Sequence, residues 1–371
     1  MIYFDNAATG GFKIRAATDA AQTVMKYLSA NPGRSGHRLS VAGAGIVHSA
    51  RQVLADFFGA QEERVIFTKN CTEALNLAIF GTLKKGGHVI TTVYEHNSVL
   101  RPLNFLKSQG LIQLDVVSPE PDIVTAIENK IKDDTYLVVM TAVSNVTGEE
   151  LPVMDVAYLC EKKGILFIVD GAQGGGHVEL SVSDGISMLA LAGHKGLGGI
   201  MGSGALILSD NTDVSPLIHG GTGSESFNLL QPESYPERLE AGTLNLPAIA
   251  ALSEGAKFVK DNLSTFSEHL IRATDYMISA LKSIKNTMVY SRPNRSGIVA
   301  FKLLNMPSAL VSDLLSSEYD VAVRGGYHCA PLMHVHLGSA DDGLVRASLA
   351  VQNSTRETAH FIRAVKDLSM R

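Results

Sequence analysis

The stretch Gly164-Ile165-Leu166-Phe167-Ile168-Val169-Asp170 places a carboxylate directly after a run of apolar residues, and Gly171-Ala172-Gln173 follows it. Further along the chain, the apolar run Met188–Ala192 leads into Gly193-His194-Lys195-Gly196. Short apolar runs of this kind predict buried strands, and open α/β sheets bind ligands beyond the carboxyl ends of their strands. The two stretches therefore predict an aspartate and a lysine at the ligand-binding edge of a sheet. Taken alone, Asp170 could equally cap a helix or lie in a surface turn.

Apolar runs and helical patterns alternate on both sides of these stretches. The predicted strands are Val65–Phe67, His88–Val93, Tyr136–Val143, Ile165–Val169, Met188–Ala192 and Ala205–Leu208. The predicted helices among them are Thr72–Gly81, Ser98–Ser108, Asp122–Ile131 and Val153–Lys163. Strands that alternate with helices need crossover connections, so this pattern predicts a mostly parallel sheet.

The pattern changes after about residue 245. The later predicted elements are helices at Pro247–Asp261 and Thr265–Ile284, strands at Gly297–Leu303, Val321–Arg324 and Leu344–Leu349, and a terminal helix to about Leu368. Ser354-Thr355-Arg356-Glu357 has the spacing of a capping box at the start of that helix. We therefore predict an α/β fold with a large domain at 15–245, built on a mostly parallel mixed sheet. A smaller α+β domain would combine 1–14 with 246–371.

The composition indicates a globular chain and argues against several classes of protein. Hydrophobic residues make up 45% of the 371 residues, which excludes disorder for most of the chain, and the net charge of −5 argues against a nucleic-acid partner. The three cysteines cannot form a disulfide framework, which fits a reducing compartment. The N-terminal residues lack the pattern of a signal peptide, and no apolar stretch reaches the roughly 20 residues of a membrane helix. We therefore expect a soluble, cytoplasmic protein without a membrane partner.

Several chemical groups gather at the predicted strand ends. Lys195 lies between glycines that let a flat ligand approach, and lysine forms Schiff bases with carbonyl cofactors. Asp170 offers an anion for a pyridinium nitrogen. Asn70-Cys71-Thr72-Glu73 opens a helix after a strand, where a phosphate can bind, and His96 ends another strand and could stack on a ring. Together these groups predict a site for pyridoxal 5′-phosphate (PLP).

These motifs resemble those of fold-type I PLP-dependent transferases, specifically the class V aminotransferase group that includes cysteine desulfurases and selenocysteine lyases. The matching segments, in chain order, are Tyr3–Thr9, Asn70–Asn76, Glu95–Asn97, Ser144–Gly148, Asp170–Gln173, Gly193–Lys195 and Glu240–Thr243. The resemblance continues to Arg346-Ala347-Ser348-Leu349 and so covers nearly the whole chain.

The resemblance implies roles for residues around the cofactor ring. Lys195 would carry the cofactor, Asp170 would face the pyridine nitrogen, and Gln173 would contact the ring hydroxyl. His96 would stack on the ring and take part in catalysis. Asn145 would lie near the cofactor and the substrate carboxylate.

The resemblance also implies the residues around the cofactor phosphate. Thr72 and His194 would hold it, with Cys71 beside them. In a homodimer with shared active sites, Thr222 would reach the phosphate of the other subunit. Gly193 stands where relatives often have a serine, which removes a hydroxyl contact to the phosphate and could weaken cofactor retention.

A second motif is Val323-Arg324-Gly325-Gly326-Tyr327-His328-Cys329-Ala330-Pro331. Cys329 lies in a polar, glycine-rich loop beside cationic side chains, which favour the thiolate, the nucleophilic form of cysteine. Cys160 lies in an apolar helical pattern and Cys71 beside the predicted phosphate site, so a structural role is expected for both.

The tight cluster of His328, Cys329, His334 and His336 leaves zinc binding as an alternative use of this loop. No zinc-finger spacing accompanies it, however, and there is no second cysteine pair. We therefore predict no metal.

The loop resembles the Arg-x-Gly-x-His-Cys-Ala segment of the second cysteine desulfurase subgroup, and the short distance in sequence from Cys329 to Arg346 agrees. The resemblance implies that Arg346 clamps the substrate carboxylate, a task that suits its bidentate guanidinium. Arg324 and His37 would also line the substrate site, together with Asn145. Judged by residue type alone, Arg346 could be a surface strand residue, and the segment around His37 could be a solvated loop.

The expected reaction converts L-cysteine to L-alanine and transfers the sulfur to Cys329 as a persulfide, with Lys195 and His96 as the other catalytic residues. A sulfur-acceptor protein or thiol would then remove that sulfur. Selenocysteine lyase and cysteine sulfinate desulfinase activities stay open. A transaminase would leave Cys329 without a role, and a PLP-binding protein without turnover is a further alternative.

Overall fold

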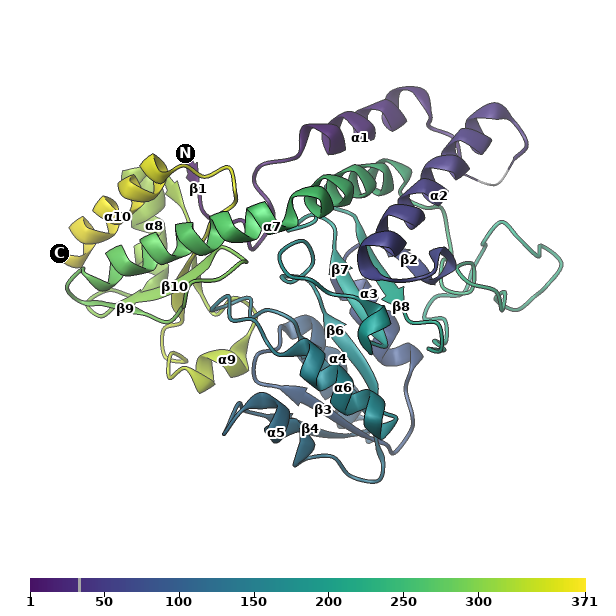
Figure 1. Ribbon diagram of the computed structural model, residues 1–371, viewed down its shortest axis with the longest axis horizontal. Helices are drawn as coiled ribbons and strands as arrows, with labels where there is room; N and C mark the ends of the chain where they lie inside the picture. Colours follow the sequence, from purple (N-terminus) through teal and green to yellow (C-terminus); the bar gives the residue numbers. More distant parts are fainter. Residues whose placement is uncertain (33–34) are drawn as a thin grey trace.

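The computed structural model of the chain describes residues 1–32 and 35–371. Its largest element is a seven-stranded sheet with the strand order β2-β8-β7-β6-β5-β3-β4 (Figure 1). The strands are β2 (Val65–Thr68), β3 (His88–Thr92), β4 (Gln113–Val117), β5 (Thr135–Thr141), β6 (Leu166–Asp170), β7 (Met188–Ala192) and β8 (Gly204–Leu208). Strands β3 to β7 are parallel, whereas β8 is antiparallel to both of its neighbours. The predicted mostly parallel mixed sheet is therefore confirmed.

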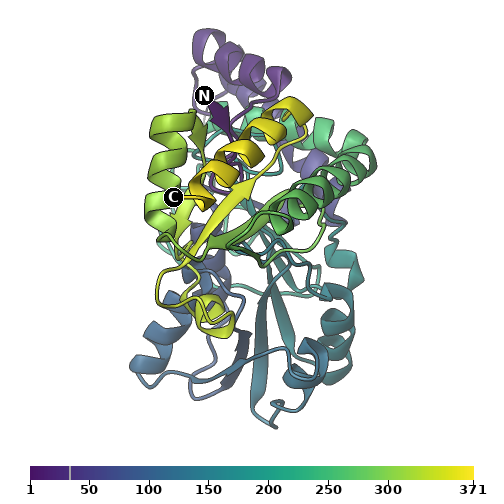
Figure 2. The ribbon, with the colours of Figure 1, turned by 90° about the vertical axis from the view of Figure 1, so that its left-hand side faces the viewer.

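Helices cover both faces of this sheet (Figures 1 and 2). One core packs α2 (Arg38–Phe58), α6 (Val153–Lys163) and the start of α7 (Leu246–Lys282) against one face. A second core packs α3 (Cys71–Gly81) and α4 (Asn97–Ser108) against the other. Successive residues of β6 alternate between the two cores, Phe167 and Val169 in the first and Ile168 in the second. Because helices cover both faces, side chains on both sides of each strand are buried, and the strand sequences are therefore continuously apolar.

The C-terminal part of the chain forms a smaller α+β unit, with both chain termini at this end of the molecule (Figure 1). Its four-stranded antiparallel sheet has the order β12-β13-β10-β9. The strands are β9 (Thr287–Val289), β10 (Ile298–Leu303), β12 (Arg324–Gly326) and β13 (Leu344–Ser348), and α8 (Ser308–Tyr319) and α10 (Thr355–Ser369) pack against them. Strand β1 (Ile2–Tyr3) pairs in parallel with β11 (Val321–Ala322), so the first residues of the chain join this unit. The domain boundaries at 14/15 and 245/246 stay a prediction.

The two helices predicted after residue 246 are in fact one helix, α7, so that prediction is wrong. Polar residues at 261–265 interrupt the apolar spacing, but they include no glycine or proline that would end a helix. The first half of α7 packs on α1 (Arg15–Tyr27) and α2, and its last turns pack on the small sheet (Figure 1). A single helix thus spans both parts of the molecule.

Other differences are local. The structure adds α1, α2, α8, β1, β4 and β9 to the predicted elements. It also shortens the helix at Asp122–Ile131 to α5 (Ile123–Glu128) and divides Val321–Arg324 between β11 and β12. A short α9 (Pro331–His336) follows the cysteine loop, and 3₁₀ turns lie at Glu62–Arg64 and Val182–Asp184. The capping box is present, since Ser354 Oγ accepts from Glu357 N at 3.3 Å while Glu357 Oε2 accepts from Ser354 N at 2.7 Å.

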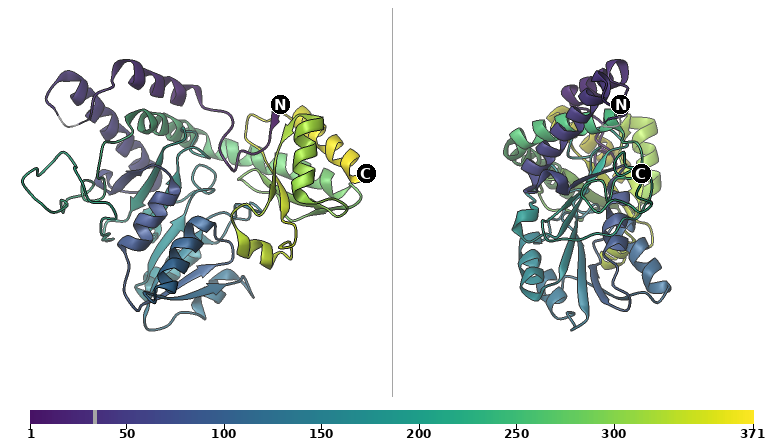
Figure 3. Two further views of the ribbon diagram at one scale, coloured as in Figure 1. Left: turned by 180° about the vertical axis from the view of Figure 1, so that it is seen from behind. Right: turned by 90° about the vertical axis from the view of Figure 1, so that its right-hand side faces the viewer.

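The segment 209–245, between β8 and α7, contains no helix or strand, and part of it projects from the body of the molecule (Figures 1 and 3). Within the described residues, 1–32 and 35–371, no helix combines the length and apolar character that crossing a membrane requires.

Candidate active site

The carboxyl ends of several strands meet at one edge of the seven-stranded sheet and bring predicted residues together. Asp170 is the last residue of β6, and Lys195 follows the end of β7. Thr72 lies in the first turn of α3 after β2, His96 caps α4 after β3, and Asn145 lies in the loop after β5. Because these strands run in the same direction, the side chains share the edge at which α/β sheets bind ligands.

Lys195 and Asp170 interact at the neighbouring ends of β7 and β6. Burial is the largest cause of a lowered pKa at Lys195; Asp170 and Cys71 oppose that shift, whereas Arg346 and Arg324 add to it. Asp170 is only 3% exposed and ends a strand, so neither a helix cap nor a surface turn describes it. A desolvated lysine amine beside a buried carboxylate suits a carbonyl ligand that also carries a cationic nitrogen.

Cys71 packs against Asp170 in the interior. Its Sγ lies 3.5 Å from Asp170 Oδ1, and burial, together with the Asp170 charge, raises the pKa of the thiol. The thiol therefore stays protonated and donates to the carboxylate. Cys160 lies on α6 in the first core, where burial raises its pKa to about 12. Neither thiol is available as a nucleophile, in agreement with the structural role that the sequence predicted.

Thr72 and His96 are linked through Ser98, a residue that the sequence did not single out. Thr72 Oγ1 lies 2.9 Å from Ser98 Oγ, which lies 2.8 Å from His96 Nδ1. Ser98 N donates to the same Nδ1 at 3.0 Å, which makes this nitrogen an acceptor. Burial lowers the pKa of His96, against the opposing charge of Asp170, so the ring is neutral. The first turn of α3, predicted to bind phosphate, and the predicted ring cover are thus joined by hydrogen bonds.

Arg346 is not a surface residue, because only 1% of it is exposed. It lies on β13, where its Nη2 forms a 3.1 Å ion pair with Asp5 Oδ1 and its Nη1 donates to Asn145 O at 2.7 Å. Its Nε is buried and has no hydrogen-bond partner among the residues that the structure describes. Burial lowers the pKa of Arg346, while Asp5 opposes this shift. Asp5 lies in one of the segments that resemble the family, but no local pattern in the sequence indicates that its carboxylate pairs with Arg346.

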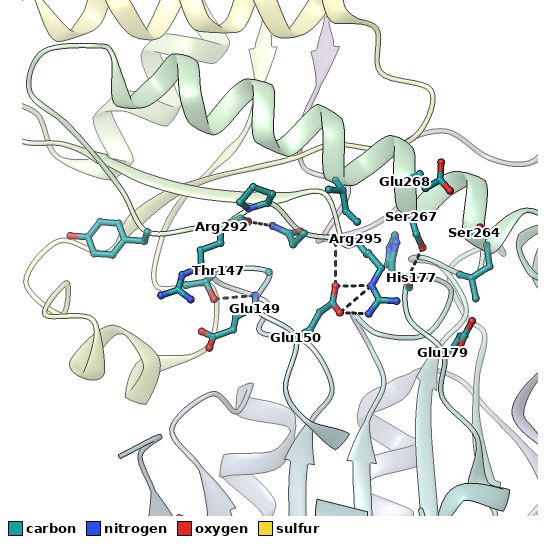
Figure 4. A pocket seen from close by; sticks show the side chains of 16 residues that line it. Thr147, Glu149, Glu150, His177, Glu179, Ser264, Ser267, Glu268, Arg292 and Arg295 are labelled. Carbon is teal, nitrogen blue, oxygen red and sulfur yellow. Dashed lines mark hydrogen bonds and ion pairs between the residues drawn. The ribbon is translucent and has the colours of Figure 1, made fainter. Parts of the chain in front are cut away.

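Asn145 faces the cysteine loop. Its Nδ2 donates to His328 O at 2.7 Å, whereas its buried Oδ1 has no hydrogen-bond partner within 1–32 and 35–371. The loop that carries Asn145 is tied to the small unit by Glu150, which forms a bidentate ion pair with Arg295 on the rim of a crevice of about 740 Å³ (Figure 4). The crevice is lined by neither Lys195 nor Asp170 and is distinct from the site. The ion pair therefore holds the Asn145 loop from outside.

Cys329 is partly exposed, unlike the other two cysteines. Arg324 Nη2 lies 3.7 Å from its Sγ, within hydrogen-bonding distance for sulfur. Asn97 N donates to Cys329 O at 2.7 Å, which anchors the loop to the start of α4 beside His96. Because Arg324 also acts on Lys195 and His96, the thiol lies next to the residues at the sheet edge.

The four residues weighed as zinc ligands do not converge on one point. His328 Nδ1 lies 3.4 Å from His334 Nε2, while Cys329 Sγ points to Arg324 and His336 is exposed. Within 1–32 and 35–371, no group of three or more His, Cys, Asp or Glu side chains is arranged to hold a metal ion.

Gln173 lies three residues after Asp170 and His194 directly precedes Lys195, but both side chains contact the N-terminal segment. Gln173 is buried, and its Nε2 donates to Ala7 O at 2.8 Å. His194 Nδ1 lies 3.0 Å from Thr9 Oγ1, and burial lowers its pKa to about 4, with Lys195 as the next cause. The ring of His194 is therefore neutral, and its predicted role toward a phosphate stays a prediction.

Thr222 and His37 are not brought to the sheet edge within one chain. Thr222 lies in the exposed 209–245 segment and contacts Ser224. His37 caps α2, where its Nδ1 accepts from Ser40 N at 3.3 Å, and it is exposed. Arg34, which belongs to the same predicted substrate segment, lies outside the described residues.

The glycine at position 193 has a structural reason. A Cβ there would clash with Ser203 Oγ and lie 3.0 Å from Ser203 O, so a larger residue would require Ser203 to move. The Ser203 hydroxyl itself donates to Ile200 O at 2.7 Å. Whether the missing hydroxyl at Gly193 weakens phosphate binding stays a prediction.

Fold and site together define a class of protein: a mostly parallel α/β sheet with a lysine and a buried aspartate at its carboxyl edge, joined by a smaller unit that supplies an arginine. The chain belongs to the class V aminotransferase family, whose family model matches residues 2–361. Members of this family depend on PLP.

Similar proteins in other organisms are named as cysteine desulfurases. A probable cysteine desulfurase of Pyrococcus abyssi is 33% identical over 389 residues, covering 99% of this chain and 94% of the relative. A cysteine desulfurase of Yersinia pestis is 29% identical, covering 99% and 93%. The apo structure of a cysteine desulfurase from Thermococcus onnurineus NA1 matches with a TM-score of 0.92 at 30% identity, covering 100% of this chain and 94% of that one.

Proposed function

We propose that this chain is a PLP-dependent cysteine desulfurase, which converts L-cysteine to L-alanine and transfers the sulfur to Cys329 as a persulfide. The observation that carries the proposal is the position of Cys329, a partly exposed thiol 3.7 Å from Arg324 and beside the lysine–aspartate edge. A transaminase would have no use for this thiol. Similarity over nearly the whole chain to proteins named as cysteine desulfurases supports the proposal.

The residues at the sheet edge fit PLP. Lys195 would bind its aldehyde, Asp170 its ring nitrogen, and Thr72 with the free N–H groups of α3 its phosphate. The neutral ring of His96 would cover the cofactor. The buried Asn145 Oδ1, which has no hydrogen-bond partner in the described part of the chain, supports a ligand at this position. When bound, PLP supplies an electron sink for the substrate Cα.

The chain's own residues would divide the remaining tasks. Arg346 would bind the substrate carboxylate, and its buried Nε, which has no hydrogen-bond partner among residues 1–32 and 35–371, would be free to donate to it. Lys195 would take the proton from Cα. The Cys329 thiolate would then form an S–S bond to the substrate sulfur as the Cβ–S bond breaks, and Cβ would take a proton to give alanine. An acceptor protein or thiol would remove the sulfur from Cys329.

Product analysis tests the proposal. With PLP, L-cysteine and a reducing thiol, we expect alanine and sulfide in equal amounts. A keto acid in place of alanine would indicate a transaminase, and cofactor binding without any product would indicate a PLP-binding protein without turnover. Parallel assays with selenocysteine and cysteine sulfinate measure the preference among the three substrates.

Replacing Arg346 by alanine is expected to lower kcat/KM for L-cysteine by about 30- to 4,000-fold, because losing one partner of a desolvated charge pair costs about 2–5 kcal/mol. Arg346→Lys keeps the charge but loses the bidentate geometry, so its kcat/KM should lie between that of the unsubstituted protein and that of Arg346→Ala. The exposed Arg292 provides the matched control, Arg292→Ala, with kcat/KM unchanged. Equal kcat/KM values for Arg346→Ala and the unsubstituted protein would remove Arg346 from substrate binding.

We also propose that two copies form the working enzyme and that Thr222 reaches the phosphate site of the partner. The 209–245 segment exposes three large apolar side chains: Phe227 is 102% exposed, Leu229 98% and Leu230 80%. Exposing such side chains to water is unfavourable, so a cluster of them marks a surface that another protein covers. Part of this segment projects from the body of the molecule (Figure 3).

The double variant Phe227→Ser, Leu229→Ser is therefore expected to sediment as a monomer and to lose PLP, while the unsubstituted protein sediments as a dimer. Tyr158→Ser removes an exposed aromatic side chain from α6 and should leave the dimer intact. A double variant that remains dimeric in analytical ultracentrifugation would contradict the assignment of this surface.

A further inference from the structure

The backbone at Cys329 has an unusual conformation. His328 and Cys329 are consecutive non-glycine residues with φ of 50° and 56°, in the left-handed region that side chains disfavour. Such conformations persist only where the surroundings hold them. The main chain is held at two carbonyls, since Asn145 Nδ2 donates to His328 O and Asn97 N donates to Cys329 O, both at 2.7 Å.

A buried chain of side chains holds the same turn from the other direction. His328 Nε2 lies 3.1 Å from Arg324 O, and His328 Nδ1 lies 3.4 Å from His334 Nε2. His334 Nδ1 lies 2.9 Å from Ser339 Oγ. His328 is 2% exposed, and His334 and Ser339 are 0% exposed. The two rings lie 5.6 Å apart with an interplanar angle of 21°.

If both rings are neutral, one arrangement of protons satisfies the three side-chain contacts just described. Arg324 O can only accept, so His328 Nε2 carries its proton and Nδ1 is an acceptor. His334 Nε2 must then donate to it, which leaves His334 Nδ1 to accept from the Ser339 hydroxyl. Both rings are neutral in this arrangement. Burial is the largest cause that lowers the pKa of His328, to about 2, and Arg346 adds to it; burial also lowers the pKa of His334.

We infer that His334 is a positioning residue for Cys329. Its imidazole fixes the orientation and tautomer of His328, which in turn holds the carbonyl of Arg324 and the left-handed turn that presents Sγ to the Arg324 guanidinium. The hydrogen-bonded chain from Ser339 through His334 and His328 thus sets the geometry of both the thiol and its cationic neighbour. The catalytic consequence of this arrangement rests on the proposed desulfurase function, whereas the geometry of the thiol does not.

The first experiment measures the rate at which iodoacetamide alkylates Cys329 in the protein without substrate, by peptide mass spectrometry. The alkylation rate depends on how the turn presents Sγ, so it reports the geometry of the thiol without any need for turnover. We expect His334→Leu to slow alkylation at least about three-fold. His334→Gln, whose amide can still donate to His328 Nδ1, should restore most of the rate. His336→Leu removes an exposed histidine two residues along α9 and should leave the rate unchanged.

Ser339→Ala provides a second, milder variant, and it should slow alkylation in the same direction as His334→Leu. In turnover assays, His334→Leu should lower kcat for alanine release without changing KM for L-cysteine, because Arg346 and Lys195 are untouched. Equal alkylation rates in all these proteins would overturn the inference even if the enzyme is a desulfurase. Slower alkylation in a protein that releases no alanine would uphold the inference while the proposed function fails.

Discussion

Replacing Lys195 by alanine is expected to lower alanine release from L-cysteine by roughly a thousand-fold or more, because the variant loses both the amine that holds PLP and the base that takes the Cα proton. Borohydride reduction of the unsubstituted protein, followed by peptide mapping, should find the pyridoxyl group on Lys195. The matched control is Lys13→Ala, since Lys13 Nζ donates to His194 O at 3.4 Å and lies close to the same loop. A pyridoxyl group on Lys13, or on no lysine, would contradict the assignment.

Replacing Cys329 by alanine should have an effect of similar size on L-cysteine turnover, roughly a thousand-fold or more, because a covalent nucleophile is removed. Lys195, Asp170 and Arg346 remain, so the variant should still bind PLP and change its absorption spectrum when L-cysteine is added. Selenocysteine turnover should be kept at least in part, since selenium leaves more readily than sulfur.

Cys160→Ala is the control for Cys329→Ala, because this cysteine is fully buried on α6 away from the site. It should retain L-cysteine turnover despite some loss of stability from the small cavity. Loss of PLP from Cys329→Ala would indicate that Cys329 has a structural role. Unchanged L-cysteine turnover in that variant would remove Cys329 from the chemistry.

The sheet and its functional edge were predictable because each strand carries its own signal. Met188–Ala192 is a strand with the predicted bounds, and Asp170 and Lys195 follow apolar runs whose direction is set by crossover connections. The C-terminal helix likewise carries its own start signal in Ser354 and Glu357. In each case a local pattern of a few residues is sufficient to specify the element.

Features that join distant parts of the chain could not be predicted in this way. Asp5 and Arg346 lie 341 positions apart, so nothing local indicates that the carboxylate would hold the arginine. The link from Thr72 through Ser98 to His96 depends on the packing of two helices from different strands. The first half of α7 packs on α1 and α2 and its last turns pack on the small unit, and local spacing does not reveal that one helix joins the two.

The position of Thr222 shows that the structure of one chain does not test a role that depends on a second copy. A single chain leaves it away from Lys195, and only an assembly of two copies could give it the role that the family resemblance implied.

His328 and His334 were considered from the sequence, with Cys329 and His336, as a metal site. Their contact with each other and with Ser339 instead depends on the strained turn before α9, which no spacing rule encodes.

The most direct test of the central claim is the mass of the peptide that contains Cys329 after a single turnover. The protein with bound PLP is mixed with L-cysteine without any reducing thiol, quenched and digested under non-reducing conditions, and free alanine is measured in the same sample. We predict that the Cys329 peptide gains the mass of one sulfur atom, in an amount equal to the alanine released, while the peptides of Cys71 and Cys160 are unchanged. Alanine released without added sulfur on Cys329, or no alanine at all, would contradict the account.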